Sequence, residues 1–189
     1  MRIVIFDPYK TGNFKINKDQ AGGYGTSNEI GNNIFSVILS SFLKKNINYS
    51  PMFAVYVYSV LKNKGFNVQY TKSFDDIKDC DLCLVTSSIV CHETEINYLK
   101  KLKEKNVYTG VIGSFCTTLP DPYLKHANFV VSGEPEFFFL NQDIKKIINE
   151  KPTGILKNLG NNLLDDLPHP AWEQTFKYGG PRAFFISFF

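Results

Sequence analysis

The sequence lacks a strong excess of charge of either sign. Its 189 residues carry 21 Lys and Arg against 18 Asp and Glu, a formal net charge of +3, and the basic residues are scattered along the chain. Nucleic-acid-binding surfaces are usually dense basic patches. The composition therefore argues against nucleic acid as a partner.

Long apolar runs are missing as well. A membrane-spanning helix requires about 20 mostly apolar residues, and no uncharged stretch of this sequence reaches that length. The apolar run that follows Arg2 ends at Asp7, which is too short for the core of a signal peptide. With four cysteines and no export signal, we expect a cytoplasmic protein with reduced thiols, and no membrane as a partner.

What the chain does contain is enough apolar material for one folded domain. Hydrophobic residues make up 43% of the sequence, and aromatic residues alone reach 15%, with 17 Phe and 10 Tyr. Such a composition excludes a disordered tail. The abundance of aromatic side chains requires a core, a ligand pocket or a docking surface to bury them.

Short apolar segments alternate with helical patterns along the first 150 residues. The segments with the length and composition of strands are Arg2–Phe6, Asn67–Thr71, 81–86, 107–112 and 129–131. The segments with helical spacing or helix-start signals are 33–44, 51–64, 93–105, 121–126 and one that begins at Pro135. Alternation of this kind is typical of a parallel sheet covered on both faces. We predict an α/β, flavodoxin-like (Rossmann-like) domain over residues 1–150, with five parallel strands in the order 2-1-3-4-5.

The remainder of the chain has a different character. Residues 151–181 contain Pro168 and Pro170 and show little periodicity beyond 154–158, so we predict an extended connector. Residues 182–189 form an apolar run that is typical of a strand. A strand this apolar requires a partner, because alone it would aggregate.

Small, hydroxyl-bearing and glycine residues follow several of the predicted strands. Ligands of open parallel sheets bind outside the carboxyl ends of the strands, so these loops form the candidate site. The glycines near residue 22 match neither a dinucleotide-binding nor a Walker pattern. The candidate cofactor-binding residues are Gly22, Gly23, Tyr24, Gly25, Thr86, Ser87, Ser88, Gly113, Ser114, Phe115, Gly133, Glu134 and Pro135.

Taken together, the order of these motifs resembles a known family. The motifs are Gly22-Gly23-Tyr24-Gly25, Val85-Thr86-Ser87-Ser88, Val111-Ile112-Gly113-Ser114-Phe115, Val130-Val131-Ser132-Gly133-Glu134-Pro135-Glu136 and the connector Asp165-Asp166-Leu167-Pro168-His169-Pro170-Ala171-Trp172. This combination resembles the N-terminal cobalamin-binding domain of cobalamin-dependent radical S-adenosylmethionine enzymes.

The resemblance implies that the domain binds cobalamin in its base-off form. It implies that the hydroxyl residues after the third strand receive the nucleotide tail, while the motifs at Gly113 and Gly133 contact the tail, the corrin and its amides. It also implies that residues 182–189 begin a barrel domain that this chain lacks. The barrel, in cis or in trans, would carry the iron–sulfur cluster and S-adenosylmethionine, and the whole enzyme would be a methyltransferase.

Two departures from related patterns limit what this chain does by itself. Cobalamin domains of mutases carry a cobalt-ligating His after the first strand, but here Tyr9 occupies that position, which favours a cofactor without a protein imidazole ligand and does not exclude binding. No Cys-x3-Cys-x2-Cys motif is present, so we expect no independent enzymatic activity and assign neither a catalytic residue nor a metal ligand.

Alternative interpretations remain. The fold also suits a receiver-like regulatory domain with Asp7 in an acidic pocket, or a scaffold that mediates protein contacts and binds no cofactor. His92 is either a polar helix-start residue or a side chain that approaches the corrin. Cys80 and Cys83 have metal-ligand spacing, but on one strand they would point to opposite faces, so we expect packing roles.

Overall fold

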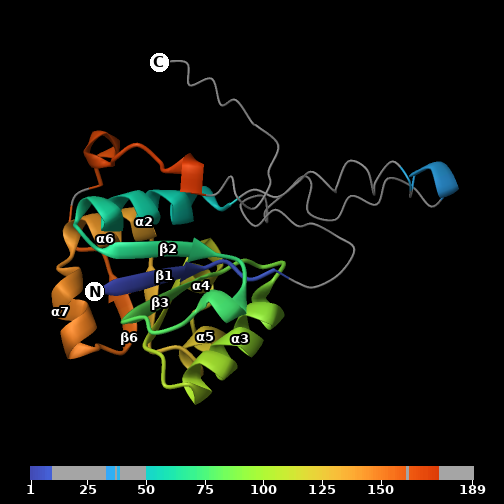
Figure 1. Cartoon of the computed structure of the whole chain (residues 1–189), viewed down its shortest axis with the longest axis horizontal. Helices are drawn as coiled ribbons and strands as arrows, with labels where there is room; N and C mark the ends of the chain where they lie inside the picture. The colour runs from blue at the N-terminus through green and yellow to red at the C-terminus, as the bar shows by residue number, and fades with distance from the viewer. Residues whose placement is uncertain (10–32, 37, 39–49, 161, 175–189) are drawn as a thin grey trace.

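The computed structural model describes residues 1–9, 33–36, 38, 50–160 and 162–174. Within these residues one parallel sheet has the strand order β2-β1-β3-β4-β5-β6 (Figure 1). The strands are β1 (Arg2–Phe6), β2 (Asn67–Thr71), β3 (Leu82–Thr86), β4 (Thr109–Ile112), β5 (Phe129–Ser132) and β6 (Gly154–Lys157). The predicted α/β class and the order of the first five strands are confirmed.

The number of strands predicted from the sequence was one too low. β6 pairs in parallel with β5, with Val131 opposite Leu156, and it comes from the stretch predicted as an extended connector. Its sequence signal is weak because the strand has only four residues at the edge of the sheet, and its residues alternate between half-buried and exposed. The boundary near residue 150 and the absent barrel stay predictions.

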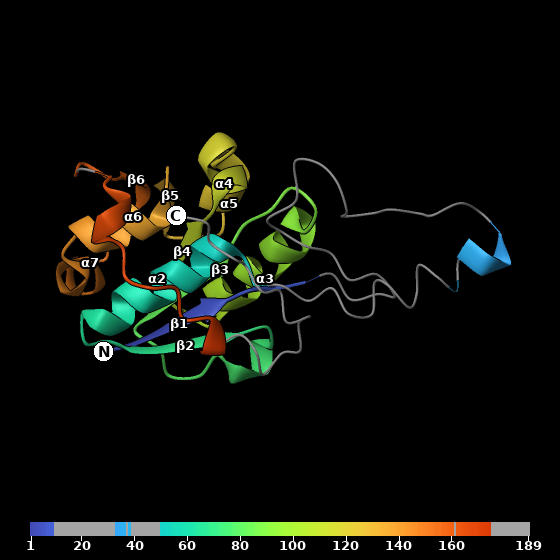
Figure 2. The ribbon, with the colours of Figure 1, turned by 90° about the horizontal axis from the view of Figure 1, so that it is seen from above.

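Helices cover both faces of the sheet (Figures 1 and 2). One face carries α2 (Met52–Asn63), α6 (Pro135–Asn141) and α7 (Ile144–Glu150). The other carries α3 (His92–Glu104), α4 (Ser114–Thr118) and α5 (Asp121–Leu124). None of the helices in the described part of the chain is both long and apolar enough to cross a membrane.

The central strands are apolar throughout because both of their faces are buried. In β1, Ile3 and Ile5 join the core under α2 and α6, while Val4 and Phe6 join the core under α3 and α5. All four side chains are fully buried. Successive strand residues point to opposite faces, so a strand covered on both sides needs a continuous apolar run.

Most helix boundaries follow their sequence signals, with one correction. α2 follows Pro51 and stops before Gly65, whose positive φ of 85° suits glycine. The helix predicted from Pro135 onward is two helices, since the chain breaks at Gln142. There the Asp143 carboxylate accepts a hydrogen bond from the Lys146 amide at 3.1 Å and caps α7.

The end of the described chain returns to α2. The Ala171 amide donates to Ser59 Oγ at 2.8 Å, and Leu167 and Ala171 pack against the core on that side of the sheet. Two short 3₁₀ turns, Leu164–Asp166 and Trp172–Gln174, lie in this segment. The predicted strand at 182–189 lies outside the described residues, as do Gly22, Gly23, Tyr24, Gly25 and most of the predicted helix 33–44.

Candidate functional site

The carboxyl ends of β1, β3, β4 and β5 lie along one edge of the parallel sheet. Of the residues predicted to bind a cofactor, this arrangement places three groups along that edge. The groups are Thr86, Ser87 and Ser88 after or at the end of β3, Gly113, Ser114 and Phe115 after β4, and Gly133, Glu134 and Pro135 after β5. Crevices at this edge are the usual ligand sites of such folds. We refer to it below as the carboxyl edge.

A buried carboxylate joins three strands beneath the carboxyl edge. Asp7 is fully buried, and its two oxygens accept hydrogen bonds from the Tyr70 hydroxyl at 2.5 Å and the Thr86 hydroxyl at 2.6 Å. Lys72 Nζ lies 4.0 Å from the same carboxylate. Burial and, next, the charge of Asp7 raise the pKa of Tyr70 well above its usual value, so Tyr70 stays a donor. Because the Thr86 hydroxyl donates its hydrogen bond to Asp7, it does not donate one to a ligand.

Sequence reasoning did not identify Tyr70 and Lys72 as parts of this network. Tyr70 lies opposite Ile5 in the β1–β2 pair, so its phenol reaches the end of β1. The only signal was a polar residue at the end of a strand, which is common in any sequence. The register of the β1–β2 pair is needed to show that Tyr70 lies close enough to bond to Asp7.

A second buried carboxylate lies below the neighbouring loop. Glu95, fully buried on α3, accepts hydrogen bonds from the Ser88 amide and hydroxyl at 3.1 and 3.0 Å and from the Tyr123 hydroxyl at 2.6 Å. Burial and the Glu95 charge raise the pKa of Tyr123, which keeps this phenol protonated as a donor. Glu95 thus ties the β3–α3 loop at Ser88 to α3, and it also accepts a hydrogen bond from Tyr123 of α5.

Gly113 is held tightly against the residue that follows β3. Its φ is +124°, and a Cβ at this position would lie 2.8 Å from Ser87 Oγ and 3.1 Å from Phe53 Cζ. Ser87 Oγ in turn accepts a hydrogen bond from the Cys116 amide at 3.1 Å. Only glycine satisfies both the backbone angle and the space, so the β3 and β4 loops approach closely here.

The solvent-facing part of the carboxyl edge consists of other residues. Ser114, Gly133 and Glu134 are exposed, whereas Phe115 is half-buried and Pro135 is buried. Gly133 has a φ of +97°, and a Cβ there would meet no atom within 4 Å. Thr117 ties the two loops together, donating to the Gly113 carbonyl and accepting from the Gly133 amide, each at 3.0 Å. The buried side chains beneath the edge are therefore held by hydrogen bonds to one another, and the backbone above them is exposed to solvent.

An imidazole lies beside this edge at the first residue of α3. His92 Nδ1 is 2.9 Å from the Ile89 carbonyl oxygen. Its ring is half-buried and packs at a tilt of 56° against Phe115, with centroids 5.6 Å apart. The sequence leaves His92 either as a corrin contact or as a polar helix-start residue, and the structure places it in contact with a predicted site residue.

The cysteines lie in the core. Cys80 precedes β3 and is half-buried, and it packs in the same core cluster as Cys83, so the expectation of opposite faces was wrong. It was wrong because only Cys83 belongs to the strand. Burial raises the pKa of both thiols. Within the described residues, no group of three His, Cys, Asp or Glu side chains is arranged to hold a metal ion.

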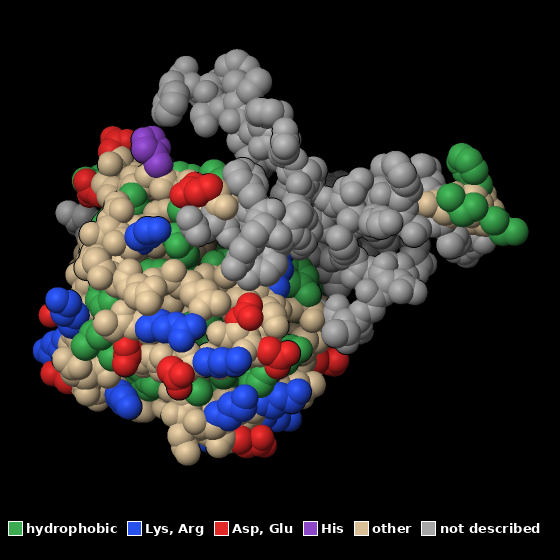
Figure 3. Space-filling view, viewed as in Figure 1, with side chains coloured by type: hydrophobic (Ala, Val, Ile, Leu, Met, Phe, Trp, Pro, Cys, Tyr) green, Lys and Arg blue, Asp and Glu red, His purple; other side chains and the backbone are tan. Residues whose placement is uncertain are grey.

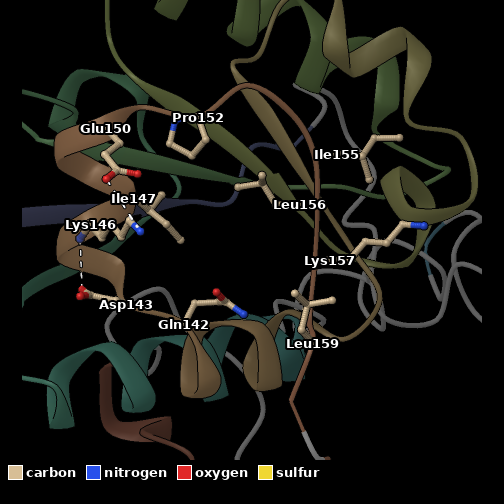
Figure 4. Close-up of a pocket in the computed structure, with 10 residues that line it drawn as sticks. All are labelled: Gln142, Asp143, Lys146, Ile147, Glu150, Pro152, Ile155, Leu156, Lys157 and Leu159. Carbon is tan, nitrogen blue, oxygen red and sulfur yellow. Dashed lines mark hydrogen bonds and ion pairs between the residues drawn. The ribbon is translucent and has the colours of Figure 1, made fainter.

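Two grooves elsewhere on the surface contain none of the predicted site residues. One of about 480 Å³ runs beside α7 and β6, where Gln142, Ile147, Leu156 and Leu159 surround the hollow (Figure 4). Two of its charged side chains, Lys146 and Glu150, pair with each other at 3.9 Å. Another groove of about 610 Å³ lies at the amino ends of the strands.

On the face shown in Figure 3, basic and acidic side chains are interspersed over the described part of the surface.

Comparison with family models, with curated proteins and with solved structures gives no match for this chain. The features that bear on the function of this chain are therefore the carboxyl edge and the resemblance of its motifs.

Proposed function

We propose that this chain is the cobalamin-binding module of a radical S-adenosylmethionine enzyme, a methyltransferase whose catalytic barrel lies outside these residues, in cis or in trans. The observation that carries the proposal is the carboxyl edge itself. Beneath it, buried carboxylates accept hydrogen bonds from Thr86, Ser88 and two phenols, and its upper surface at Ser114, Gly133 and Glu134 is exposed.

The residues present suit a large, flat, amide-rich ligand. Gly133 leaves open space where any other residue would place a Cβ, so a ring could approach the backbone there. The Ser114 hydroxyl and the Glu134 carboxylate are exposed and suit the amide groups that surround a corrin. Thr86 and Ser88 donate to buried carboxylates, so in this proposal they shape the floor under the ligand.

When bound, cobalamin would supply a cobalt-carried methyl group for transfer to a substrate radical. The residues of this chain bind and orient the cofactor. Thr117 fixes the spacing of the β4 and β5 loops. Asp7 and Glu95 hold the ends of β1 and β3 and the start of α3. The proposal includes a cytoplasmic location, where the four free thiols stay reduced.

The receiver-like alternative requires an acidic pocket that is open to a metal ion and a phosphoryl donor. Asp7 is fully buried, and both of its oxygens accept hydrogen bonds from hydroxyl groups. This arrangement favours the cofactor-binding proposal over the receiver alternative. A scaffold that binds no cofactor remains an outcome of the test.

The test is titration of the chain with hydroxocobalamin, followed by desalting and a visible spectrum. We expect a retained, stoichiometric corrinoid spectrum. Ser114→Tyr, which fills the exposed edge, should lower the retained fraction at least several-fold. Glu104→Tyr is the control, because it places the same new side chain at an exposed position at the far end of α3. No retention, by this chain and by one that carries the barrel, would refute the proposal in favour of a scaffold.

A further inference from the structure

His92 is the one histidine of this chain placed at the carboxyl edge. The chain has three histidines, and all three lie in the described residues. His126 lines the groove at the amino ends of the strands, where burial and then the charges of Lys100, Lys103 and Lys125 lower its pKa. His169 is exposed in the segment after β6. Within the described residues, the structure shows a contact with a candidate site residue for His92 and for neither of the other two histidines.

The hydrogen bond at Nδ1 determines which ring nitrogen carries the lone pair. A carbonyl oxygen only accepts, so the 2.9 Å contact with the Ile89 oxygen requires the proton on Nδ1. In the neutral ring Nε2 then carries the lone pair. Metal-ligating histidines usually show this arrangement, in which one nitrogen donates to a carbonyl or carboxylate and the other is directed to the metal.

The His92 ring is also restricted in its rotation, and its Nε2 is available to bind a ligand. Packing against Phe115 and the bond to Ile89 restrict its rotation from two sides, which lowers the entropy lost when a ligand binds. Nε2 makes no hydrogen bond to any residue in the part of the chain that the structure describes. A half-buried imidazole with one nitrogen fixed and the other unused is suited to act as a ligand.

The position at which mutases carry their cobalt ligand offers no imidazole. Tyr9 stands there, and Lys72 Nζ lies 4.5 Å from the centre of its ring, so this phenol takes part in a cation–π contact. We propose that His92 Nε2 is an axial ligand of the cobalt, provided by the β3–α3 loop. This inference rests on the proposed function and deepens it.

The test is electron paramagnetic resonance of the full chain loaded with cobalamin and reduced to the cobalt(II) state. An axial nitrogen splits the cobalt lines into triplets when it is ¹⁴N and into doublets when it is ¹⁵N. We expect triplets with unlabelled protein and doublets when only histidine is labelled with ¹⁵N. The labelled comparison requires no substitution, and it excludes the cofactor's own base as the source.

The cobalamin that His92→Gln binds should lack the protein-derived splitting, whereas His126→Gln, the matched control, should retain both the cobalamin and the splitting. Bound cobalamin whose splitting does not respond to the histidine label would overturn the inference and leave the proposed function standing. Doublets that persist in labelled His92→Gln would overturn it in the same way. Absence of bound cobalamin in the wild-type chain would overturn both the inference and the proposed function.

Discussion

The hydroxyl of Thr86 donates to Asp7 Oδ1 at 2.6 Å and joins the end of β3 to the end of β1 beneath the carboxyl edge. Both residues are fully buried, so this bond has no competition from solvent. The two residues are 79 positions apart in the sequence, yet their bond fixes where the loops that follow β1 and β3 leave the sheet.

Thr86→Val should therefore destabilise the fold. The substitution keeps the shape of the side chain and removes a donor from a buried carboxylate, which costs about 1–3 kcal/mol of unfolding free energy. Urea denaturation followed by circular dichroism measures this change. Thr118→Val is the control: its exposed hydroxyl bonds only to the Ser114 carbonyl, so we expect a change within about 0.5 kcal/mol. Equal losses for the two variants would contradict the role assigned to Asp7.

The glycines at the edge should differ in their tolerance of alanine. Gly113 and Gly133 both have positive φ, so alanine at either position strains the backbone by about 1–3 kcal/mol. At Gly113 the added Cβ would also lie 2.8 Å from Ser87 Oγ, whereas at Gly133 it would meet nothing within 4 Å. We expect a larger loss of unfolding free energy for Gly113→Ala than for Gly133→Ala.

Chemical denaturation of the two variants, side by side, measures this difference. Visible spectra after loading with hydroxocobalamin add a second reading. If Gly133 contacts the ligand, its alanine variant should lose retention while remaining the more stable of the two. A Gly113→Ala variant as stable as Gly133→Ala would show that the β3 and β4 loops can separate without cost.

The features that the sequence could predict are those carried by local patterns. Continuous apolar runs such as Arg2–Phe6 indicated buried parallel strands, and Pro51 with Gly65 predicted the ends of α2. The loops of the carboxyl edge followed from topology alone, because parallel strands end at the same side. These predictions needed no knowledge of distant contacts.

What the sequence could not predict depends on contacts between distant residues. The periodicity at 154–158 did not show that this stretch joins the sheet, and β6 is placed there by its pairing with β5. Tyr70, Glu95 and Tyr123 join their networks through register and helix packing, across 63, 7 and 28 positions. Likewise, the engagement of the Thr86 and Ser88 hydroxyls beneath the edge follows only from the folded chain.

Thiol reactivity should separate Cys80 from the other three cysteines. Cys83, Cys91 and Cys116 are at most 2% exposed, whereas Cys80 is half-buried. Burial raises the pKa of Cys116 to about 12, so its thiol stays protonated at neutral and mildly alkaline pH. With a thiol reagent such as 5,5′-dithiobis(2-nitrobenzoate), we expect native protein to react slowly at Cys80 alone and denatured protein to react at all four. Rapid reaction of Cys116 in the native state would contradict its place in the core.

Alkaline pH should destabilise the protein through its buried tyrosines. Burial raises the pKa of Tyr108 to about 12, and it raises the pKa of Tyr70 well above its usual value, with the charge of Asp7 adding to the shift. A folded-state pKa above the unfolded one means that the unfolded chain releases its proton first. The stabilisation from the neutral phenols is therefore complete below about pH 10 and is lost as the pH rises through the folded-state values.

Melting temperatures measured across this alkaline range test the assignment. We expect a steep fall above about pH 10 in the wild-type chain. Tyr70→Phe should be less stable at neutral pH, because it removes a donor from Asp7, and its fall at alkaline pH should be shallower. Tyr56→Phe, at a half-buried position on α2, is the matched control and should retain the wild-type slope. If Tyr70→Phe also retained that slope, the Tyr70 phenol would not be the group whose ionisation opposes folding.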